Sequence, residues 1–242
     1  MGGLARRATA FRRYRNDPSL ARKSLFVAGG YEFQPIRPGK EKSLSVARAL
    51  AEAYARLRYD ILCLTPREQA WLDAAQAGEV PGALVLGDAP RTKILARGDF
   101  KTGFVIFPVL KDPYGLPDRG AVRAVTRAAS ALRPRVDLVV GLSSWGQKAE
   151  FRLLEQSPGT FDALLGSGPA KNWGHKPMAG NRTLWVRPEF DGRSVQQIEI
   201  LARPGQGRSW QWEEGKNFRV IHRTLDKSVS HDMKIWGLFR WM

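Results

Sequence analysis

The chain is poor in the residues that build disulfides and metal sites. Its 242 residues include one cysteine and three histidines. The single thiol, Cys63, excludes an internal disulfide, and its place in an apolar run favours a buried, inert side chain over a reactive one. The histidines, His175, His222 and His231, all lie in the last third of the chain. A centre of two divalent metals needs several His and Asp ligands from different strand ends, so this composition argues against an ordinary dinuclear centre.

Long apolar runs are also missing. No segment approaches the twenty or so consecutive apolar residues that span a bilayer, and a basic stretch follows Met1 instead of the apolar core of an export signal. We therefore expect no transmembrane segment and no signal peptide in this sequence, and the compartment stays open. The length and the hydrophobic fraction of 43% are those of a globular α/β protein with one domain and at most a small appendage.

Acidic side chains are outnumbered by basic ones. Lys plus Arg total 39 against 23 Asp plus Glu, which gives a formal net charge of +16 and a surface that attracts anions. The arginines are densest in residues 6–15 and 119–135. Such density supplies a salt-sensitive affinity for nucleic acid without base reading, but it more often marks a plain solvated surface. Nucleic acid is therefore an alternative partner and not the expected one.

The most informative segment is residues 136–146, Val-Asp-Leu-Val-Val-Gly-Leu-Ser-Ser-Trp-Gly. Its run of Val and Leu predicts a strand covered on both faces, whose end points into the crevice where α/β proteins place their chemistry. Residues 161–168 repeat the arrangement after a helix-like stretch at 147–156, so the three segments predict a βαβ unit. The first loop offers Ser144 and Trp145 where a metal ligand would be expected.

These two strands resemble the second half of a calcineurin-like metallophosphoesterase domain of the periplasmic 5′-nucleotidase type. In that family the first strand ends in Leu-Ser-His-x-Gly and the second in Gly-His-x-His. The matching segments here read Leu142-Ser143-Ser144-Trp145-Gly146 and Gly166-Ser167-Gly168-Pro169. The resemblance implies that Ser144, Ser167 and Pro169 stand where the family has histidines.

The resemblance extends through the amino-terminal part. Gly2-Gly3-Leu4-Ala5-Arg6 is similar to the Gly-Gly-x-Ala-Arg segment that follows the family's first strand and its Asp-x-His motif, and that motif is not in this sequence. Residues 24–30 match the strand that ends in Gly-Asp, with Gly30 in place of the metal-bridging aspartate. Residues 59–68 match the strand that leads to Gly-Asn-His-Glu. In this last motif the chain has Pro66 for the asparagine ligand, Arg67 for the catalytic histidine, and a matching Glu68.

The resemblance spans roughly residues 2–202 and implies a two-sheet αββα sandwich of the metallophosphoesterase type in a single α/β domain. It places that domain at residues 1–203, followed by a basic, Trp-rich extension at 204–242 that packs on the domain. Members of the family use two divalent metals and are commonly periplasmic. Because the matched ligand positions are changed, we expect a degenerate domain without a bound metal. A truncated amino terminus and an oligomer are both compatible with the absent first motif.

Strands and helices are predicted to alternate along the chain. Apolar residues recur at helical spacing over residues 43–58, and Pro66 suits the first turn of a helix in which Glu68 is favoured by the helix dipole. Residues 183–187 and 195–201 predict a closing hairpin connected through Asp191-Gly192. The other expected helices are 4–15, 66–77, 119–132 and 147–156, and the other expected strands are 24–28, 60–64, 83–86 and 103–110.

The sequence from Pro204 onward is rich in tryptophan and basic residues. Interleaved aromatic and cationic side chains can stack on bases or lie at a membrane interface, but such tryptophans more often pack back onto their own domain, which is what we expect here. The residues concerned are Trp210, Trp212, Trp236, Trp241, Arg208, Lys216, Arg219 and Arg223.

One loop has the composition of a metal-free anion site. Backbone amides in a Gly-rich loop, with cationic side chains nearby, can hold phosphate or sulfate. An arginine from a neighbouring strand end would add a fork that matches phosphate oxygens. The alternative, and the commoner case, is a surface connection whose glycines serve turns. The hypothesised anion-binding residues are Gly166, Ser167, Gly168, Lys171 and His175, with Lys176 nearby and Arg67 as the arginine donor.

Three functions therefore compete. The first is a pseudoenzyme of the 5′-nucleotidase-like hydrolase family that serves as an anion-binding or scaffold module. The second is a residual phosphomonoester or nucleotide hydrolase that uses Asp88, Asp99 or His175 as substitute ligands. The third is a charge-driven nucleic-acid-binding protein. We favour the first, because every matched metal-ligand position has lost its ligand chemistry.

Overall fold

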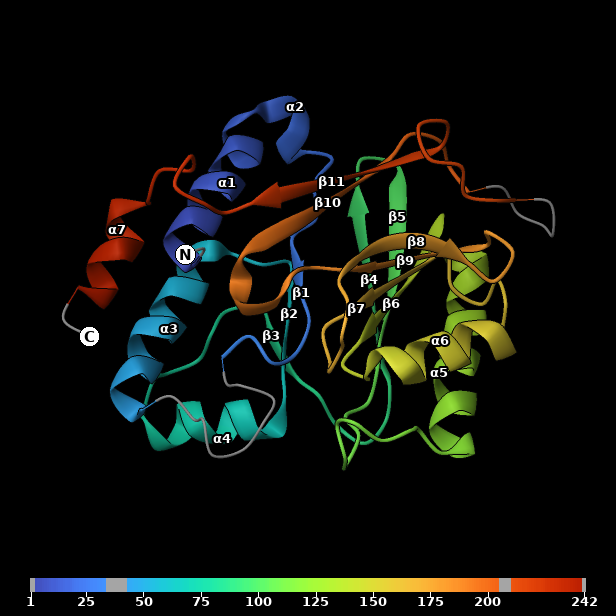
Figure 1. Ribbon diagram of the computed structural model, residues 1–242, viewed down its shortest axis with the longest axis horizontal. Helices are drawn as coiled ribbons and strands as arrows, with labels where there is room; N and C mark the ends of the chain where they lie inside the picture. Colours follow the sequence, from blue (N-terminus) through green and yellow to red (C-terminus); the bar gives the residue numbers. More distant parts are fainter. Residues whose placement is uncertain (1–2, 34–42, 205–209, 241–242) are drawn as a thin grey trace. The chain divides into compact units, whose positions relative to one another are not determined.

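The computed structural model describes residues 3–33, 43–204 and 210–240. It has a mixed α/β fold with several sheets (Figure 1), which confirms the class predicted from the sequence. Within this fold the chain divides into two compact units, and each is described by itself. Unit 1 comprises Met1–Leu86, Glu189–Val195 and Thr224–Met242, and unit 2 comprises Gly87–Pro188 and Gln196–Arg223.

Unit 1 is built on a three-stranded parallel sheet. Its elements are α1 (Leu4–Asn16), α2 (Pro18–Ala21), β1 (Val27–Ala28), α3 (Leu44–Leu57), β2 (Ile61–Leu64), α4 (Pro66–Ala74), β3 (Ala83–Val85), η2 (Phe190–Gly192), α7 (Met233–Trp236) and η3 (Gly237–Phe239). The strand order is β1-β2-β3, with Val27 opposite Ile61 and Leu62 opposite Ala83. The central strand β2 is buried throughout, and Cys63 is buried within it as predicted. Helices α1, α3 and α4 share one apolar core with this strand.

The start of α4 follows directly from the sequence. The Thr65 hydroxyl accepts a hydrogen bond from the Glu68 amide at 3.2 Å, and the Glu68 carboxylate accepts one from the Thr65 amide at 2.8 Å. Two amides that would otherwise lack partners at the helix end are thereby satisfied. Pro66 occupies the first turn, where its missing N–H costs nothing. The predicted helix start at Pro66 is confirmed.

A buried arginine ties α1 to the rest of unit 1. The Arg7 guanidinium donates to the Glu32 carboxylate at 2.8 Å and to the Tyr59 hydroxyl at 3.0 Å. The Tyr54 hydroxyl donates to the same carboxylate at 2.5 Å. Burial raises the pKa of Tyr59 to about 12, against the attraction of Arg7 and with the help of the Glu32 charge. Tyr59 is therefore held as a neutral hydroxyl inside the unit.

Unit 2 contains a six-stranded mixed sheet. Its elements are β4 (Arg91–Arg97), β5 (Phe100–Ile106), α5 (Arg119–Leu132), η1 (Arg133–Arg135), β6 (Leu138–Ser143), α6 (Gln147–Gln156), β7 (Ala163–Gly166), β8 (Gly174–Met178) and β9 (Thr183–Arg187). Strands β10 (Ser194–Ile200) and β11 (Phe218–Thr224) also belong to unit 2, except for Ser194, Val195 and Thr224, which are assigned to unit 1. The order is β4-β5-β6-β7-β9-β8, parallel from β5 to β9 and antiparallel at both edges. The predicted βαβ unit is confirmed as β6-α6-β7.

Helices α5 and α6 cover the same face of this sheet (Figure 1). Each connects neighbouring parallel strands in the same direction, β5 to β6 and then β6 to β7, and right-handed crossovers place such helices on one side. Val125 and Leu132 of α5 share one apolar core with Leu153 and Leu154 of α6. The outer faces of both helices are therefore left to solvent.

The predicted closing hairpin is wrong. Strand β9 lies between β7 and β8, and β10 pairs with β11 instead. A strand has two edges, and both edges of β9 are taken, so residues 195–201 cannot join it. Asp191 and Gly192 lie in the short helical turn η2. Strands β4, β8 and β11 were not expected from the sequence, because they are basic or interrupted by Pro177 and so lack a clear apolar pattern.

The carboxyl-terminal segment contributes to both units. Trp212 is buried in unit 2, where its indole N–H donates to the Asp162 carbonyl at 2.7 Å. Trp236 belongs to unit 1 and stacks on His231 with ring centroids 4.2 Å apart. In the described part of the chain, no helix is long and apolar enough to cross a membrane. Three residues singled out from the sequence, Gly2, Arg208 and Trp241, lie outside the described residues.

The buried hydroxyl of Tyr59 predicts destabilisation at alkaline pH. An unfolded tyrosine ionises near about pH 10, whereas folded Tyr59 keeps its proton to about 12. The contribution of Tyr59 to the free energy of unfolding is therefore fully present below the pKa of the unfolded tyrosine. It is lost as the pH rises from that pKa to the folded one, by about 1.4 kcal/mol per pH unit. Burial also raises the pKa of Tyr54, which adds to the loss. Urea unfolding followed by tryptophan fluorescence across this pH range measures the slope.

Tyr59→Phe is the matched control for this experiment. It keeps the ring and removes the titrating group, so its unfolding free energy should fall less steeply with pH. The same slope in both proteins would contradict the assignment.

Candidate functional site

The loops that follow β6 and β7 in unit 2 pack tightly against each other. The amide and the hydroxyl of Ser167 both donate to the Ser143 carbonyl, at 2.8 and 3.1 Å. The Gln147 amide donates to the Pro169 carbonyl at 2.8 Å. A Cβ on Gly168 would overlap the carbonyl oxygens that end the first loop, so this position has room only for glycine. The two loops at the carboxyl ends of β6 and β7 are therefore in direct contact.

A buried ion pair lies at the same strand ends. Arg187 ends β9 and is 2% exposed, and its guanidinium donates to the Glu150 carboxylate at 2.8 Å. The Trp185 indole N–H donates to the other oxygen of that carboxylate at 2.8 Å. Arg187 also donates to the carbonyl oxygen of Gly168 and, at 3.4 Å, to that of Trp145. The pair therefore bridges α6, β9 and both loops.

This network occupies the space beside the loop glycines. A Cβ on Gly166 would lie 2.6 Å from both the Arg187 guanidinium and the Glu150 carboxylate. Sequence reasoning missed Arg187, Glu150 and Trp185. The available signal was weak, since an arginine at a strand end and a glutamate in the first turn of a helix are common on surfaces, and only the fold buries them together.

In unit 1 a second buried carboxylate, that of Glu68, lies in the first turn of α4, just after the end of β2. Glu68 accepts hydrogen bonds from the amides of Thr65, Tyr31 and Phe33 at 2.8, 3.0 and 2.7 Å, and from the Thr65 hydroxyl at 2.9 Å. Burial raises the pKa of Glu68, and the three amide donors oppose that rise. The bonds hold the segment after β1, including Tyr31 at a φ of 69°. Glu68 is thus an anchor for that segment.

The other residues of unit 1 that the sequence analysis singled out have ordinary structural places. Gly30 is buried just after β1, and Pro66 is in the first turn of α4 with Arg67 next to it, partly exposed. Arg67 belongs to unit 1, whereas the Gly-rich loop proposed to share an anion with it belongs to unit 2.

The hypothesised anion loop is more structured than its composition indicated. Its second half forms the edge strand β8, and His175 in that strand bonds Glu214 at 3.1 Å. Lys171 is exposed, and its amide donates to the Gln147 side chain at 3.3 Å. Trp173 is 45% exposed and stacks on His222 with centroids 4.5 Å apart. The loop is therefore fixed at both ends and presents Lys171 to solvent.

The donors at these strand ends do not match what a pair of divalent metals requires. In the described ranges, no three His, Cys, Asp or Glu side chains lie close enough together to hold a metal ion. Two buried polar atoms there, Ser144 Oγ and Arg187 Nε, have no hydrogen-bond partner among the described residues. One is a neutral hydroxyl and the other a cationic N–H, so neither supplies an anionic or imidazole ligand.

Two of the three suggested substitute ligands have other partners. Asp99 pairs with Arg203, and His175 pairs with Glu214. Asp88 is exposed on the segment before β4. None of them belongs to a cluster of metal-ligating side chains in the part of the chain that the structure describes.

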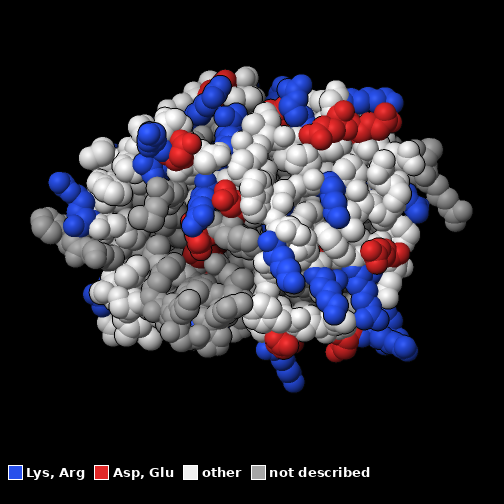
Figure 2. Space-filling model, in the orientation of Figure 1, with Lys and Arg blue, Asp and Glu red and all other residues white. Residues whose placement is uncertain are grey.

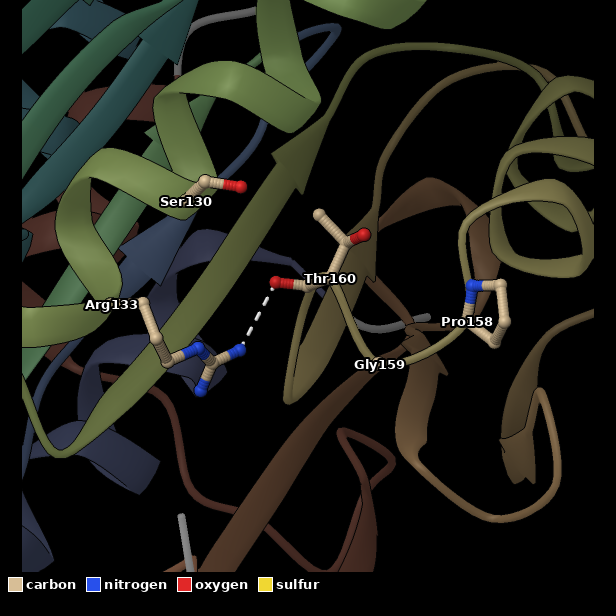
Figure 3. Close-up of a pocket in the computed structure, with 5 residues that line it drawn as sticks. All are labelled: Ser130, Arg133, Pro158, Gly159 and Thr160. Atoms are coloured by element: carbon tan, nitrogen blue, oxygen red, sulfur yellow. Dashed lines mark hydrogen bonds between the residues drawn. The ribbon is translucent and has the colours of Figure 1, made fainter. Parts of the chain in front are cut away.

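A surface hollow of about 330 Å³ lies at the opposite ends of the unit 2 strands (Figure 3). It is lined by Ser130, Arg133, Pro158, Gly159 and Thr160. The Arg133 guanidinium donates to the Thr160 carbonyl at 3.0 Å and to the Asp162 carboxylate at 2.5 Å. Burial raises the pKa of Asp162, and Arg133 opposes that rise. Since α/β folds bind ligands at the carboxyl ends of strands, we do not regard this hollow as the functional site.

Comparisons with known proteins identify the fold. Over its whole length the chain is similar to the sulfate thiohydrolase SoxB of Thermus thermophilus, with a TM-score of 0.68 and 16% identity, and to the NAD nucleotidase NadN of Haemophilus influenzae, with a TM-score of 0.61 and 10% identity. It covers 46% and 56% of those chains, about half of their length. No family model and no curated protein matches the sequence. The chain has a metallophosphoesterase-like α/β fold, as the sequence motifs predicted.

The buried ion pair predicts a large coupling between Glu150 and Arg187. Arg187→Met leaves a buried carboxylate without its cation and should lower the free energy of unfolding by about 3 to 5 kcal/mol. Glu150→Gln should cost a similar amount. The double variant removes both charges and keeps an acceptor for Trp185, so most of the loss should be regained. Urea unfolding of the four proteins gives the coupling, and additive losses would contradict it.

Proposed function

We propose that this chain is a metallophosphoesterase-fold protein that does not hydrolyse phosphoesters by the two-metal route and acts instead as a binding or scaffold module for an anionic ligand. Two-metal hydrolysis requires carboxylate and imidazole ligands that are free to converge on the metals from several strand ends. In this chain the strand ends carry serine, glycine, proline and arginine at the matched positions.

The observation that carries the proposal is the buried pair of Arg187 and Glu150. The guanidinium and its carboxylate partner fill the carboxyl ends of β6, β7 and β9, the place where the fold would hold cations. Because the two charges neutralise each other, the pair offers divalent ions no free anionic ligand. The Glu150 carboxylate already accepts hydrogen bonds from Arg187 and from the Trp185 indole.

Glu68 in unit 1 supports the same proposal independently. It is the one residue of its motif that matches the family, and its carboxylate accepts four hydrogen bonds from the surrounding chain. Binding a metal would require breaking several of them, at a cost of roughly 1 to 3 kcal/mol for each buried donor left unsatisfied. The retained acid is best explained by helix capping and loop anchoring.

Purified protein should therefore contain no stoichiometric Mn, Zn or Mg. It should show no chelator-sensitive turnover of a generic phosphomonoester, of nucleoside monophosphates or of NAD, with an active nucleotidase assayed in parallel as the positive control. Metal content and activity are measured on one sample. Stoichiometric metal together with turnover that EDTA abolishes would refute the proposal.

In unit 2 the anionic ligand is proposed to contact Lys171, which is exposed in the Gly-rich loop. Its ammonium would contribute a charge-assisted hydrogen bond, so Lys171→Ala should weaken phosphate binding about tenfold. Calorimetric titration with inorganic phosphate measures this. Lys23→Ala removes one charge from an exposed site in unit 1 and serves as the control. If Lys171→Ala leaves the affinity unchanged, the anion site is not at this residue.

A further inference from the structure

The chain has two arginine-rich helices, and the structure uses them differently. On α1, Arg7 is buried against Glu32, Arg12 pairs with Asp232, and Arg15 donates to the carbonyl oxygens of Leu57 and Arg58. Arg6 donates to the Val229 carbonyl at 3.0 Å. These arginines hold unit 1 together and are largely unavailable to a partner.

The arginines of α5 have no such role. Arg119, Arg123 and Arg127 follow one another at intervals of four residues, so they lie along one face of the helix. All three are exposed, and none of their side chains has an ion pair or hydrogen bond with another described residue. The helix itself contains no acidic residue, and its opposite face is packed into the core of unit 2. The cations therefore face solvent without neutralisation.

Helix α6 extends this basic surface. Helix α6 lies on the same face of the sheet as α5 (Figure 1) and shares its apolar core. Lys148 and Arg152 are exposed on its outer side, and Lys176 of the edge strand β8 lies over the Phe151 ring at 4.3 Å. In Figure 2 the Lys and Arg side chains gather over the region of α5 and α6. The acidic residues at its margins are Asp118, which caps α5, and Glu155 near the end of α6.

We infer that this surface, the α5–α6 basic face, binds the phosphate backbone of a nucleic acid. The face is defined by Arg119, Arg123, Arg127, Lys148, Arg152 and Lys176. The inference is independent of the proposed lack of hydrolysis, because none of these side chains takes part in the network at the strand ends.

Spacing and chemistry favour a nucleic acid as the occupant. The three arginines of α5 span about 12 Å along the helix, the length of three to four phosphates on one strand of a duplex. Four of the six cations are arginines, whose planar forks match phosphate oxygens. A membrane-binding helix would insert its apolar face into lipid, but Val125, Ala129 and Leu132 of α5 are already buried in the core.

The test compares three triple variants of the full chain. Arg119→Gln, Arg123→Gln and Arg127→Gln together lower the formal charge from +16 to +13, since 16 minus 3 is 13. Binding to a mixed-sequence DNA duplex of about 30 base pairs is followed by fluorescence anisotropy between about 50 and 200 mM salt. We expect the variant to bind at least about tenfold more weakly, and the slope of log affinity against log salt to become shallower by about 2 to 3.

The control is Arg13→Gln, Arg22→Gln and Lys23→Gln, three exposed cations of unit 1 whose loss lowers the charge equally. It should keep most of the affinity and the salt slope. Replacing the three α5 arginines with lysine should keep the slope while weakening binding less than glutamine does. Circular dichroism melting checks that all variants fold, since surface changes of this kind shift stability little.

Three outcomes would overturn the inference. The first is no DNA binding by the unmodified protein at the lowest salt. The second is an equal loss in the control and test variants, which would assign binding to diffuse charge. The third is tighter binding to vesicles rich in phosphatidylserine than to DNA, lost in the α5 variant, which would assign the face to an anionic membrane surface.

Discussion

The ion pair between Arg187 and Glu150 is the interaction on which the carboxyl ends of the unit 2 strands depend. Two charges can be buried only if each has several good partners. Here they come from α6, from β9 and from the loops after β6 and β7. The requirement reaches into the loops themselves, because Gly166 and Gly168 leave the space that the guanidinium and the backbone occupy. By composition these glycines indicate a flexible loop, but in the structure they are required for the packing of the ion pair and the two loops.

Unit 1 also buries a carboxylate at its strand ends, and hydrogen bonds from the backbone stabilise its charge. Glu68 is buried, and three backbone amides and a hydroxyl make up for the lost hydration. Capping of α4 and anchoring of the segment after β1 are both tasks of this one carboxylate. In each unit the polar groups at the strand ends are used to hold the chain, and this is the physical basis for proposing a binding module in a fold that elsewhere supports hydrolases.

The arginines of helices α1 and α5 differ in whether their charges are paired within the protein. Arg6, Arg7, Arg12 and Arg15 of α1 are paired with carboxylates or backbone carbonyls, whereas the arginine side chains of α5 are not. In the sequence alone, residues 6–15 and 119–135 are both dense in arginine, and this density does not distinguish them. Only the placement of acidic residues and carbonyl groups in three dimensions distinguishes a cation that stabilises the protein from one that is left to attract an anion.

Local patterns in the sequence were sufficient for the α/β class, the β6-α6-β7 unit, the start of α4 at Pro66 and the extent of α5. These follow from short-range rules, namely apolar periodicity, capping and the conformation of proline, which act within a few residues. The pairing of β9 with β7 and β8, the edge strands β4 and β8, and the meeting of Arg187 with Glu150 were decided only by the tertiary structure. Each depends on which strand edges are free and on which charges are buried together, and residues far apart in the chain settle both.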